Sequence, residues 1–298
     1  MSLWGRVFKP KILRRIICRE NGQPRLPDQK RDTAVHSVIC RGKADFTLFN
    51  EHMGHLLEGF SPEDRILVKI NLNTADPYPA STDPDTLDGL LGMLEGNGFR
   101  NLTVGVCSAN YRLPSRRVMK DTPLDNVIRN RAGIVFFDEG KWVNVPVKGE
   151  CLQRVVIPEC VYEADRIIYL ANLKTHRSAD FSMGMKLAMG FVHPLLRLGY
   201  HREHLQEKVV EIMLAVRPDL IFLDARNPFI TGGPDTGNTA RADQILAGRD
   251  LLSVDLEGYR ILYRLKQENH CLEGFHADPF GMRQFMHAKS LMEREERP

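Results

Sequence analysis

The sequence predicts an α/β fold: a mixed, mostly parallel sheet built from β-α-β units with helices on both faces, and an inserted subdomain as an open alternative. Short apolar runs recur along the chain, and an amphipathic helical pattern separates the first two. A strand, a helix and a second strand in this order predict parallel strands joined by a right-handed crossover. With 298 residues and 43% hydrophobic content, the chain is long enough for one large domain or two small ones.

The first β-α-β unit spans residues 66–106. Residues 66–70 and 102–106 are the two strand candidates, and the helix between them is expected to begin at Pro84 with Asp83 as its N-cap. Gly98 suits the C-terminal cap, because glycine adopts the left-handed conformation without strain. The apolar face of this helix consists of Leu87, Leu90, Leu91 and Leu94.

Two further strands and two further helices are predicted by similar patterns. Residues 167–171 and 220–223 are apolar runs of strand length, and Asp224 ends the second. A stripe of apolar residues predicts a helix over 205–216, and a last helix is expected from about residue 251.

The chain divides into three segments. Residues 1–60 form a basic N-terminal arm and the lead-in to the domain, residues 61–267 form the α/β domain, and residues 268–298 form a peripheral C-terminal tail. Residues 112–153 have mixed charge, several proline breaks and a short β-like piece at 134–137. The sequence leaves open whether this segment is an insertion that forms a lid or a subdomain.

The charge balance excludes several classes of partner. A formal net charge of +3, from 41 basic and 38 acidic residues, predicts no nucleic-acid partner. The basic arm is followed by no long apolar stretch, so neither a secretory signal nor an integral membrane segment is predicted, and a cytoplasmic location is expected. An arm that docks on a membrane surface or a partner is the alternative. The basic residues of the arm are Arg6, Lys9, Lys11, Arg14, Arg15 and Arg19.

Six cysteines are scattered along the chain without a C-x-x-C pair. Their spacing fits neither a zinc ribbon nor an iron–sulfur cluster, so no intrinsic iron–sulfur motif is predicted and the cofactor stays open. Cys107, at the end of the second strand candidate, is close to the expected cleft, with a buried thiol as the alternative.

Lysine and histidine side chains follow the strand candidates at the edge of the sheet where ligands bind in open α/β folds. Lys69 and Asn71 lie two residues apart, and Lys174 and His176 repeat this spacing, so each pair shares one face of an extended segment. Lys186 can return to the same edge from the segment that follows. Three ammonium groups predict an anionic ligand, a carboxylate or a phosphate, unless single lysines pair with carboxylates or reach solvent.

His176 is the candidate for proton transfer, because its ordinary pKa lies near neutrality; metal binding and loop capping are the alternatives. His193, His201 and His204 form a weak metal-ligand cluster, and no carboxylate completes a metal motif around them. The sequence therefore assigns no metal ligand.

Two carboxylates and a glycine-rich loop complete the candidate site. Asp224 ends a buried strand, a position typical of functional carboxylates and also of turn caps. Asp255 lies on the apolar stripe of the last helix, so we expect an ion pair with Lys69 or Lys186, or a contact with the ligand. The loop over residues 231–238 lacks P-loop spacing and is expected to be an anion nest or a lid.

An ordered series of motifs resembles the DUF362 family, named for its unknown function, over roughly residues 66–265. The series consists of ILVKINL at 66–72, STDP at 81–84, NLKTH at 172–176, Met185-Lys186, Gly190, PDLIFLD at 218–224, GGP at 232–234, Gly237 and Asp255. The resemblance implies a soluble α/β protein, found mainly in bacteria and archaea, whose relatives often carry an attached ferredoxin-like domain that binds iron–sulfur clusters.

The chain departs from the family pattern at two positions. Gly105 is followed by Val106 where relatives commonly carry an acidic residue, and Leu187 stands where an asparagine often follows the lysine. An altered activity or a changed ligand is therefore expected.

Two functions are consistent with these residues. The first is an enzyme that acts on a small anionic metabolite, in which lysines bind the anion, His176 moves a proton and an aspartate orients the cations. The second is a non-catalytic binding or electron-transfer accessory protein that works with a separate, ferredoxin-like iron–sulfur partner. The candidate catalytic residues are His176, Lys174 and Asp224. The candidate ligand-binding residues are Lys69, Asn71, Thr82, Asp83, Lys186, Gly232, Gly233 and Asp255.

Overall fold

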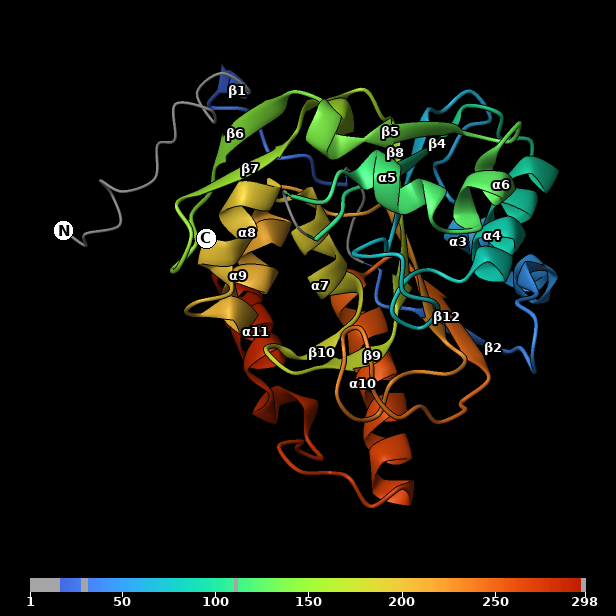
Figure 1. The fold of residues 1–298 in the computed structure, drawn as a ribbon, viewed down its shortest axis with the longest axis vertical. Helices are drawn as coiled ribbons and strands as arrows, with labels where there is room; N and C mark the ends of the chain where they lie inside the picture. The colour runs from blue at the N-terminus through green and yellow to red at the C-terminus, as the bar shows by residue number, and fades with distance from the viewer. Residues whose placement is uncertain (1–16, 28–31, 110–111, 296–298) are drawn as a thin grey trace.

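A seven-stranded sheet forms the centre of the protein (Figure 1). The computed structural model describes residues 17–27, 32–109 and 112–295. In spatial order the strands of the sheet are β2 (Val35–Ile39), β12 (Gln244–Gly248), β11 (Leu220–Ala225), β8 (Arg166–Asn172), β3 (Ile66–Ile70), β4 (Leu102–Val106) and β5 (Gly133–Phe136). β11, β8, β3, β4 and β5 run parallel, whereas β12 is antiparallel to both of its neighbours. The predicted mixed, mostly parallel sheet is confirmed.

Helices cover both faces of the sheet, as predicted. Successive strand residues point to opposite faces, so Val68 belongs to one buried core and Leu67 to the other. The first face is covered by η1 (Phe46–His52), α3 (Met53–Leu56), α4 (Pro84–Gly96), α5 (Ser115–Lys120) and α6 (Leu124–Ile128). The second is covered by α7 (Gly184–Leu187), η4 (Ala188–Phe191), α8 (Pro194–Tyr200), α9 (Leu205–Glu211), η5 (Ile212–Leu214), α10 (Leu251–Glu268) and α11 (Arg283–Glu295). Figure 1 shows α4 and α9 on opposite sides of the strands.

The first β-α-β unit forms as predicted. α4 begins at Pro84, and the carboxylate of Asp83 accepts a hydrogen bond from the backbone N–H of Asp85 at 2.7 Å. Gly98 follows the helix with a φ of +92°, a conformation that is free of strain only for glycine. The predicted leucine face is completely buried, and each buried leucine stabilises the fold by about 1.5–3 kcal/mol.

A smaller sheet lies beside the main one, with β6 (Trp142–Pro146) between β1 (Ile17–Glu20) and β7 (Arg154–Pro158). Residues 112–153, expected as a lid or a subdomain, are divided between the two sheets. Their first part, with α5, α6 and β5, extends the main sheet, because the short β-like piece pairs in parallel with β4. Their last part is β6, which packs into the second core. Short 3-10 turns are η2 (Phe137–Glu139), η3 (Glu159–Tyr162) and η6 (Pro279–Gly281).

The C-terminal tail contributes to the core instead of lying at the periphery. Phe285 of α11 is fully buried, and its ring stacks on Phe181 at a centroid distance of 5.1 Å. His287 Nε2 lies 3.0 Å from Glu211 Oε1 of α9. The cause is an apolar stripe at three-residue spacing within a charge-rich segment. The buried residues of the stripe are Met282, Phe285, Ala288 and Leu291.

The lead-in to the domain is also part of the core. β2 forms one edge of the main sheet. Phe46 and Phe49 are buried against Phe222, with ring centroids 5.2 and 5.6 Å from it. Of the basic residues predicted to form an arm, those before residue 17 lie outside the described residues, and Arg19 is exposed on β1.

The long helices are amphipathic rather than uniformly apolar. α10 buries Leu252, Tyr259 and Leu262, whereas Glu257 and Arg260 pair on its exposed side at 2.8 Å. Within the described ranges, no helix is both long enough and apolar enough to cross a membrane.

Candidate functional site

The candidate site lies at the carboxyl ends of β3 and β8, which are neighbours at the centre of the sheet. From β3 the chain adds β4 and β5 on one side, and from β8 it adds β11 on the other. Where the strand order reverses in this way, the crossover connections leave a crevice in which ligands bind. A cavity of about 220 Å³ occupies this position. Its polar lining consists of Lys69, Asn71, Asn73, Thr74, His176, Ser182, Lys186, Arg197, His201 and Asp235.

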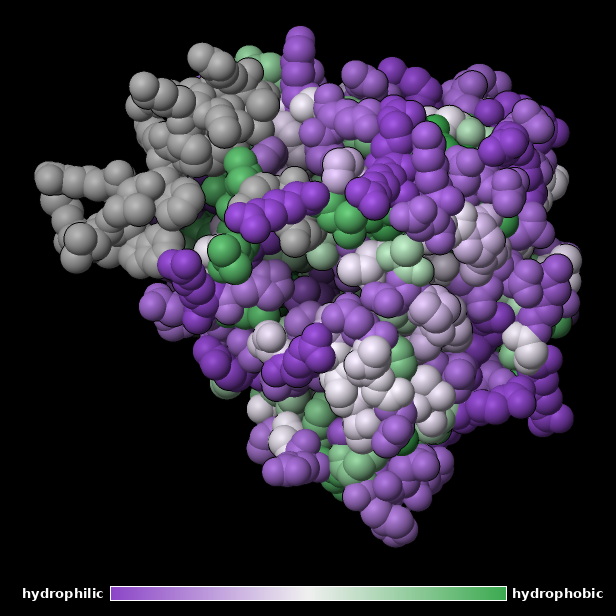
Figure 2. All heavy atoms as spheres, viewed as in Figure 1, coloured by the Kyte–Doolittle hydropathy of each residue, from purple (hydrophilic) through white to green (hydrophobic). Residues whose placement is uncertain are grey.

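The lysine–histidine stretch, expected to be extended, forms one strand of a β-hairpin. β9 (Lys174–His176) pairs antiparallel with β10 (Asp180–Ser182). His176 and Ser182 line the cavity, so the hairpin forms one of its walls. Figure 2 shows that hydrophilic side chains cover most of this face of the molecule and that the face is hollowed near its centre, where Figure 1 shows α7 beside the hairpin.

Lys69 is buried at the end of β3, with 1% of its surface exposed. Its Nζ donates to the carbonyl of Ile70 at 2.6 Å and lies 5.7 Å from the ring centroid of Phe137. Burial lowers the pKa of Lys69 to about 7. A Cβ atom at Gly190 would lie 2.8 Å from this Nζ, so any larger residue at this position would displace the end of the lysine side chain.

Lys174 and Lys186 are a second pair of cations at this edge. Lys174 is fully buried and donates to the carbonyl of Ala80. Burial lowers its pKa to about 7, and the nearby Lys186 ammonium adds to the effect. Lys186 lies on α7, where burial and the charge of Arg197 lower its pKa to about 8. In the part of the chain that the structure describes, Lys186 has no hydrogen-bond or ion-pair partner.

Arg197 is a fourth cation at this edge, which the sequence did not predict. It lies on α8 with 5% of its surface exposed. Its guanidinium donates to the carbonyls of Val192 at 2.8 Å and Gly190 at 3.0 Å, and also to that of Ser108. These carbonyls fix the guanidinium at the cavity without neutralising its charge. The signal in the sequence is one arginine within the otherwise apolar helix Pro194–Tyr200.

His176 is held as a neutral imidazole. Its Nδ1 accepts a hydrogen bond from the backbone N–H of Ser178 at 3.2 Å, so the proton of the neutral ring is on Nε2. Burial, with the charges of Lys186 and other neighbouring cations, lowers its pKa to about 2. His201, whose Nδ1 lies 2.7 Å from the carbonyl of Arg197, also lines the cavity, and burial lowers its pKa as well.

Asn71 brings an unused donor to the cavity. Its backbone N–H donates to Thr82 Oγ1, and its carbonyl accepts from the Thr82 N–H, each at 2.9 Å. Its side-chain Nδ2 is buried and has no partner among the described residues. A buried amide without a partner costs about 1–3 kcal/mol, so its presence at a cavity indicates a ligand or water. Thr82 thus positions Asn71 and does not itself line the cavity.

The charge of the cavity is not balanced. Within the described ranges, no carboxylate forms an ion pair with Lys69, Lys174, Lys186 or Arg197. Asp235 is the acidic side chain in the lining, and it pairs with Arg177 at 3.1 Å.

Asp224 and Asp83 lie outside this cavity, in a second buried cluster. Asp224 lies within β11 instead of ending it, and it accepts from Tyr78 at 2.9 Å and from Thr86 at 2.6 Å. Arg226 donates to Asp224 Oδ2 at 2.7 Å and lies 3.1 Å from Asp83 Oδ2. This network holds the start of α4 against β11, so both aspartates have structural partners.

Asp255 also lies outside the cavity, and neither lysine expected as its partner pairs with it. Its carboxylate accepts from the backbone N–H groups of Gly184 and Met185, each at 2.8 Å. Burial raises the pKa of Asp255 to about 7. The carboxylate therefore anchors the first turn of α7, the helix that carries Lys186.

The glycine-rich loop lies beside the hairpin. Gly232 and Gly233 have φ values of +67° and +72°, and a Cβ atom at Gly233 would lie 1.9 Å from the carbonyl oxygen of Thr175. The backbone N–H of Gly233 donates to the carbonyl of Thr236 at 2.7 Å, so it is not free to bind an anion. The loop contributes Pro234 and Asp235 to the cavity instead.

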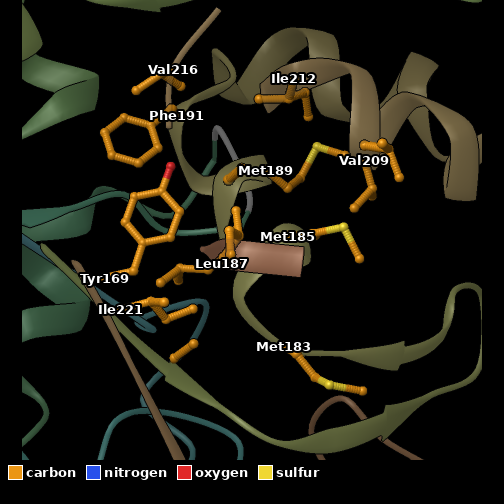
Figure 3. Close-up of a cluster of buried hydrophobic side chains, with 14 of the residues drawn as sticks. Tyr169, Met183, Met185, Leu187, Met189, Phe191, Val209, Ile212, Val216 and Ile221 are labelled. Atoms are coloured by element: carbon orange, nitrogen blue, oxygen red, sulfur yellow. The ribbon is translucent and has the colours of Figure 1, made fainter. Parts of the chain in front are cut away.

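The methionines of residues 183–189 pack into the core. Figure 3 shows Met185 and Met189 among apolar side chains that include Val209 and Ile212. Cys107 is 1% exposed and belongs to the same core. These residues therefore pack α7 and η4 against the core.

The described residues hold no group of three or more His, Cys, Asp or Glu side chains arranged to bind a metal ion. His193 caps α8, because its Nδ1 accepts from the backbone N–H of Leu195 at 3.2 Å. Its ring also contacts Trp142 at a centroid distance of 4.6 Å.

Comparison with known proteins places these residues in a wider group. The family model described as "Domain of unknown function (DUF362)" matches residues 66–260. The thylakoid-associated protein sll1697 of Synechocystis is 24% identical over 222 residues, which cover 69% of this chain and 65% of that protein. The chain therefore spans slightly less than two thirds of that relative.

Two solved structures are similar at low identity. A protein from Thermotoga maritima is 13% identical with a TM-score of 0.45, over 76% of this chain and 60% of that one. The lactate racemase apoprotein from Thermoanaerobacterium thermosaccharolyticum is 14% identical with a TM-score of 0.41, over 69% of this chain and 50% of that one.

Proposed function

This chain belongs to the DUF362 family, a domain of unknown function, and from the geometry of its cleft we propose that it is an enzyme that binds a small anionic metabolite, a carboxylate or a phosphate. The observation that supports this proposal is the unbalanced charge at the cavity. Three cations, Lys69, Lys186 and Arg197, line the cavity with the buried Lys174 nearby, and among the described residues no carboxylate pairs with any of them.

Without a ligand, such a cluster of cations lowers the free energy of unfolding. Burial and mutual repulsion both disfavour the charged forms, which is why the pKa of each lysine is lowered. Natural sequences tolerate such conflicts mainly at functional sites. An anion would restore the balance, because its charge raises the pKa of each ammonium group and its oxygens accept their hydrogen bonds.

The donors that face the cavity can be assigned to a bound anion. Arginine has five N–H donors, and Arg197 uses three of them on backbone carbonyls, which leaves two for a carboxylate or phosphate oxygen. Lys186 and the Nδ2 of Asn71 have no other partner among the described residues. The cavity of about 220 Å³ is below the roughly 300–1,000 Å³ typical of drug-sized ligands, so the metabolite is small.

The role of His176 differs from the proton transfer expected from the sequence. A ring whose pKa is lowered to about 2 is a poor base, and its Nε2–H is a donor that stabilises negative charge on a substrate oxygen. The lysines, with pKa values of about 7 to 8, are better suited to exchange protons at neutral pH. This favours an enzyme over an accessory protein, although a separate iron–sulfur partner stays a prediction.

Ligand binding to matched variants tests the proposal. Calorimetric titration of the full chain with inorganic phosphate and with succinate is expected to detect binding of at least one of them. Truncation of one partner of a buried charge pair costs about 2 kcal/mol or more. Lys186→Met should therefore weaken binding at least about 30-fold.

The matched control is Lys266→Met. Lys266 is a buried lysine whose Nζ donates to the carbonyl of Ile230 at 2.9 Å, and it does not line this cavity. This variant should bind the anion as the wild type does. Equal affinity in Lys186→Met and the wild type, or no binding of either anion, would contradict the proposed function.

A further inference from the structure

We propose that Lys186 is a nucleophile that forms a carbon–nitrogen double bond with the carbonyl group of a small oxo acid bound in the cleft. The inference rests on the proposed function, because the carboxylate of the oxo acid is the anion that the cleft would hold. It adds the chemical class of the substrate and names the residue that reacts with it.

The three lysines differ in how they are held. Lys69 Nζ donates to the carbonyl of Ile70, and Lys174 Nζ donates to that of Ala80. Lys186 lines the cavity, and in the described part of the chain its amine has no partner. An amine attacks a carbonyl carbon with its lone pair, so the lysine that no other group orients or protonates is the one free to react.

The surroundings of Lys186 also favour the reactive form of the amine. A lysine becomes nucleophilic when it is desolvated or lies next to another cation. Both conditions hold here, because the amine of the half-buried Lys186 is desolvated and lies near Lys174 and Arg197. Its pKa is lowered to about 8, so near pH 8 about half of the amine is neutral.

The other groups at the cavity match the two ends of an oxo acid. The two remaining donors of Arg197 suit the planar carboxylate, which accepts two parallel hydrogen bonds. Asn71 Nδ2 and His176 Nε2–H are uncharged donors that suit the carbonyl oxygen, on which negative charge develops during attack. A cavity of about 220 Å³ limits the substrate to a few carbon atoms.

The reaction balances without a further reactant. The nitrogen lone pair forms the C–N bond while the C=O π electrons move to oxygen, and one proton passes from nitrogen to that oxygen. The C–O bond then breaks, and the oxygen leaves as water with a second proton from Lys69, which lines the same cavity and whose pKa of about 7 suits this transfer. The product is a protonated imine, which draws electrons from the adjacent carbon and so activates the bonds at that carbon.

Reductive trapping tests the proposal. The full chain is incubated at about pH 8 with glyoxylate, pyruvate, 2-oxobutyrate or acetoacetate, and sodium borohydride is added to reduce any imine to a stable amine. Intact mass spectrometry should show a gain of one oxo acid less one oxygen atom for at least one member of this panel. Peptide mapping should place the gain on Lys186.

Two variants separate this inference from the proposed function. Lys186→Arg keeps the positive charge but loses the nucleophile. The oxo acid should therefore raise the Tm of this variant as it raises that of the wild type, but no adduct should form. Lys266→Met should give the adduct in wild-type yield.

Each other outcome overturns a defined part of the argument. A wild-type protein whose Tm rises with oxo acids but that gives no adduct would overturn the imine and leave anion binding intact. An adduct on Lys69 or Lys174, or an adduct retained in Lys186→Arg, would overturn the assignment to Lys186. A wild type that neither traps an oxo acid nor binds oxo acids, phosphate or succinate would overturn the proposed function as well.

Discussion

Two buried clusters of charge lie at the same end of the sheet, and they differ in how completely their charges are paired. Around Asp224, the carboxylate oxygens accept from Tyr78, Thr86 and Arg226, and Arg226 also pairs with Asp83. At the cavity, Lys69, Lys186 and Arg197, with Lys174 nearby, have no carboxylate partner among the described residues, and the Asn71 amide has an unpaired donor. The charges around Asp224 neutralise one another, so a structural role accounts for them. The positive charges at the cavity are not neutralised by the protein, so a bound anion is needed to balance them.

This contrast changes how strand-end residues are interpreted. In the sequence, Asp224, which follows an apolar run, and Lys69, near the end of another, are equally good candidates for a functional role, because both are expected at the edge where ligands bind. The structure separates them by their partners. Completeness of pairing is therefore a better guide to the site than position on the sheet.

The largest expected effect is a loss of stability when the paired cluster is broken. Asp224→Ala leaves the buried guanidinium of Arg226 with one carboxylate partner instead of two, and removal of one partner of a buried ion pair costs about 3–5 kcal/mol. Urea unfolding measures the change. Asp125→Ala, which breaks an exposed pair with Arg129, is the control and should cost about 0.5 kcal/mol or less. Equal losses in the two variants would remove the distinction between the clusters.

A substitution at the unpaired cluster should have the opposite sign. Lys69→Met removes a buried charge that other cations repel, and replacing buried ionic groups by apolar side chains stabilises proteins by about 1–4 kcal/mol. The free energy of unfolding should therefore rise while binding of phosphate or succinate weakens. A less stable variant would show that Lys69 is part of the architecture.

The unpaired cluster should make the stability of the protein depend on pH. The three cleft lysines have pKa values of about 7 to 8 in the folded protein against an ordinary 10.5, so above about pH 7 the unfolded chain binds more protons. The free energy of unfolding should rise with pH through this window, up to about pH 10, and the cost of the buried charges is fully present below pH 7. Lys69→Met should reduce that slope, whereas Lys266→Ala at a distant site should retain most of it. A flat profile in the wild type would contradict the lowered pKa values.

The smallest expected effect on stability is at the rim of the cavity. Asp235→Asn breaks an exposed pair with Arg177, which contributes about 0.5 kcal/mol or less. It also removes the acidic side chain from the lining, so anion affinity should increase a few-fold in a calorimetric titration. Unchanged affinity would place the bound anion away from this rim.

Local signals in the sequence predicted most of the sheet and part of the site. The bounds of β3 and β4 and the start of α4 follow from apolar runs and capping residues next to one another in the chain. Lys69, Asn71, His176 and Lys186 meet at one cavity because the ends of parallel strands share an edge.

The remaining features depend on contacts between distant segments. Asp224 accepts hydrogen bonds from Tyr78 and Thr86, which are far away in the sequence. Asp255 accepts from backbone N–H groups of α7, and no local sequence pattern indicates any of these partners. Arg197 was missed because an apolar helix with one arginine gives no reason to expect its charge to be buried. α11 was missed because its charges conceal the apolar stripe.

The position of the cavity means that ligand binding would affect the local stability of the central strands. Lys69 and Asn71 come from an early part of the chain, whereas Lys186 and Arg197 come from a much later one. A bound anion would therefore link the segment that follows β3 with the segments that follow β8, at the centre of the sheet. We expect it to slow amide hydrogen exchange in both strands together, so that occupancy of one small cavity is felt along the middle of the whole sheet.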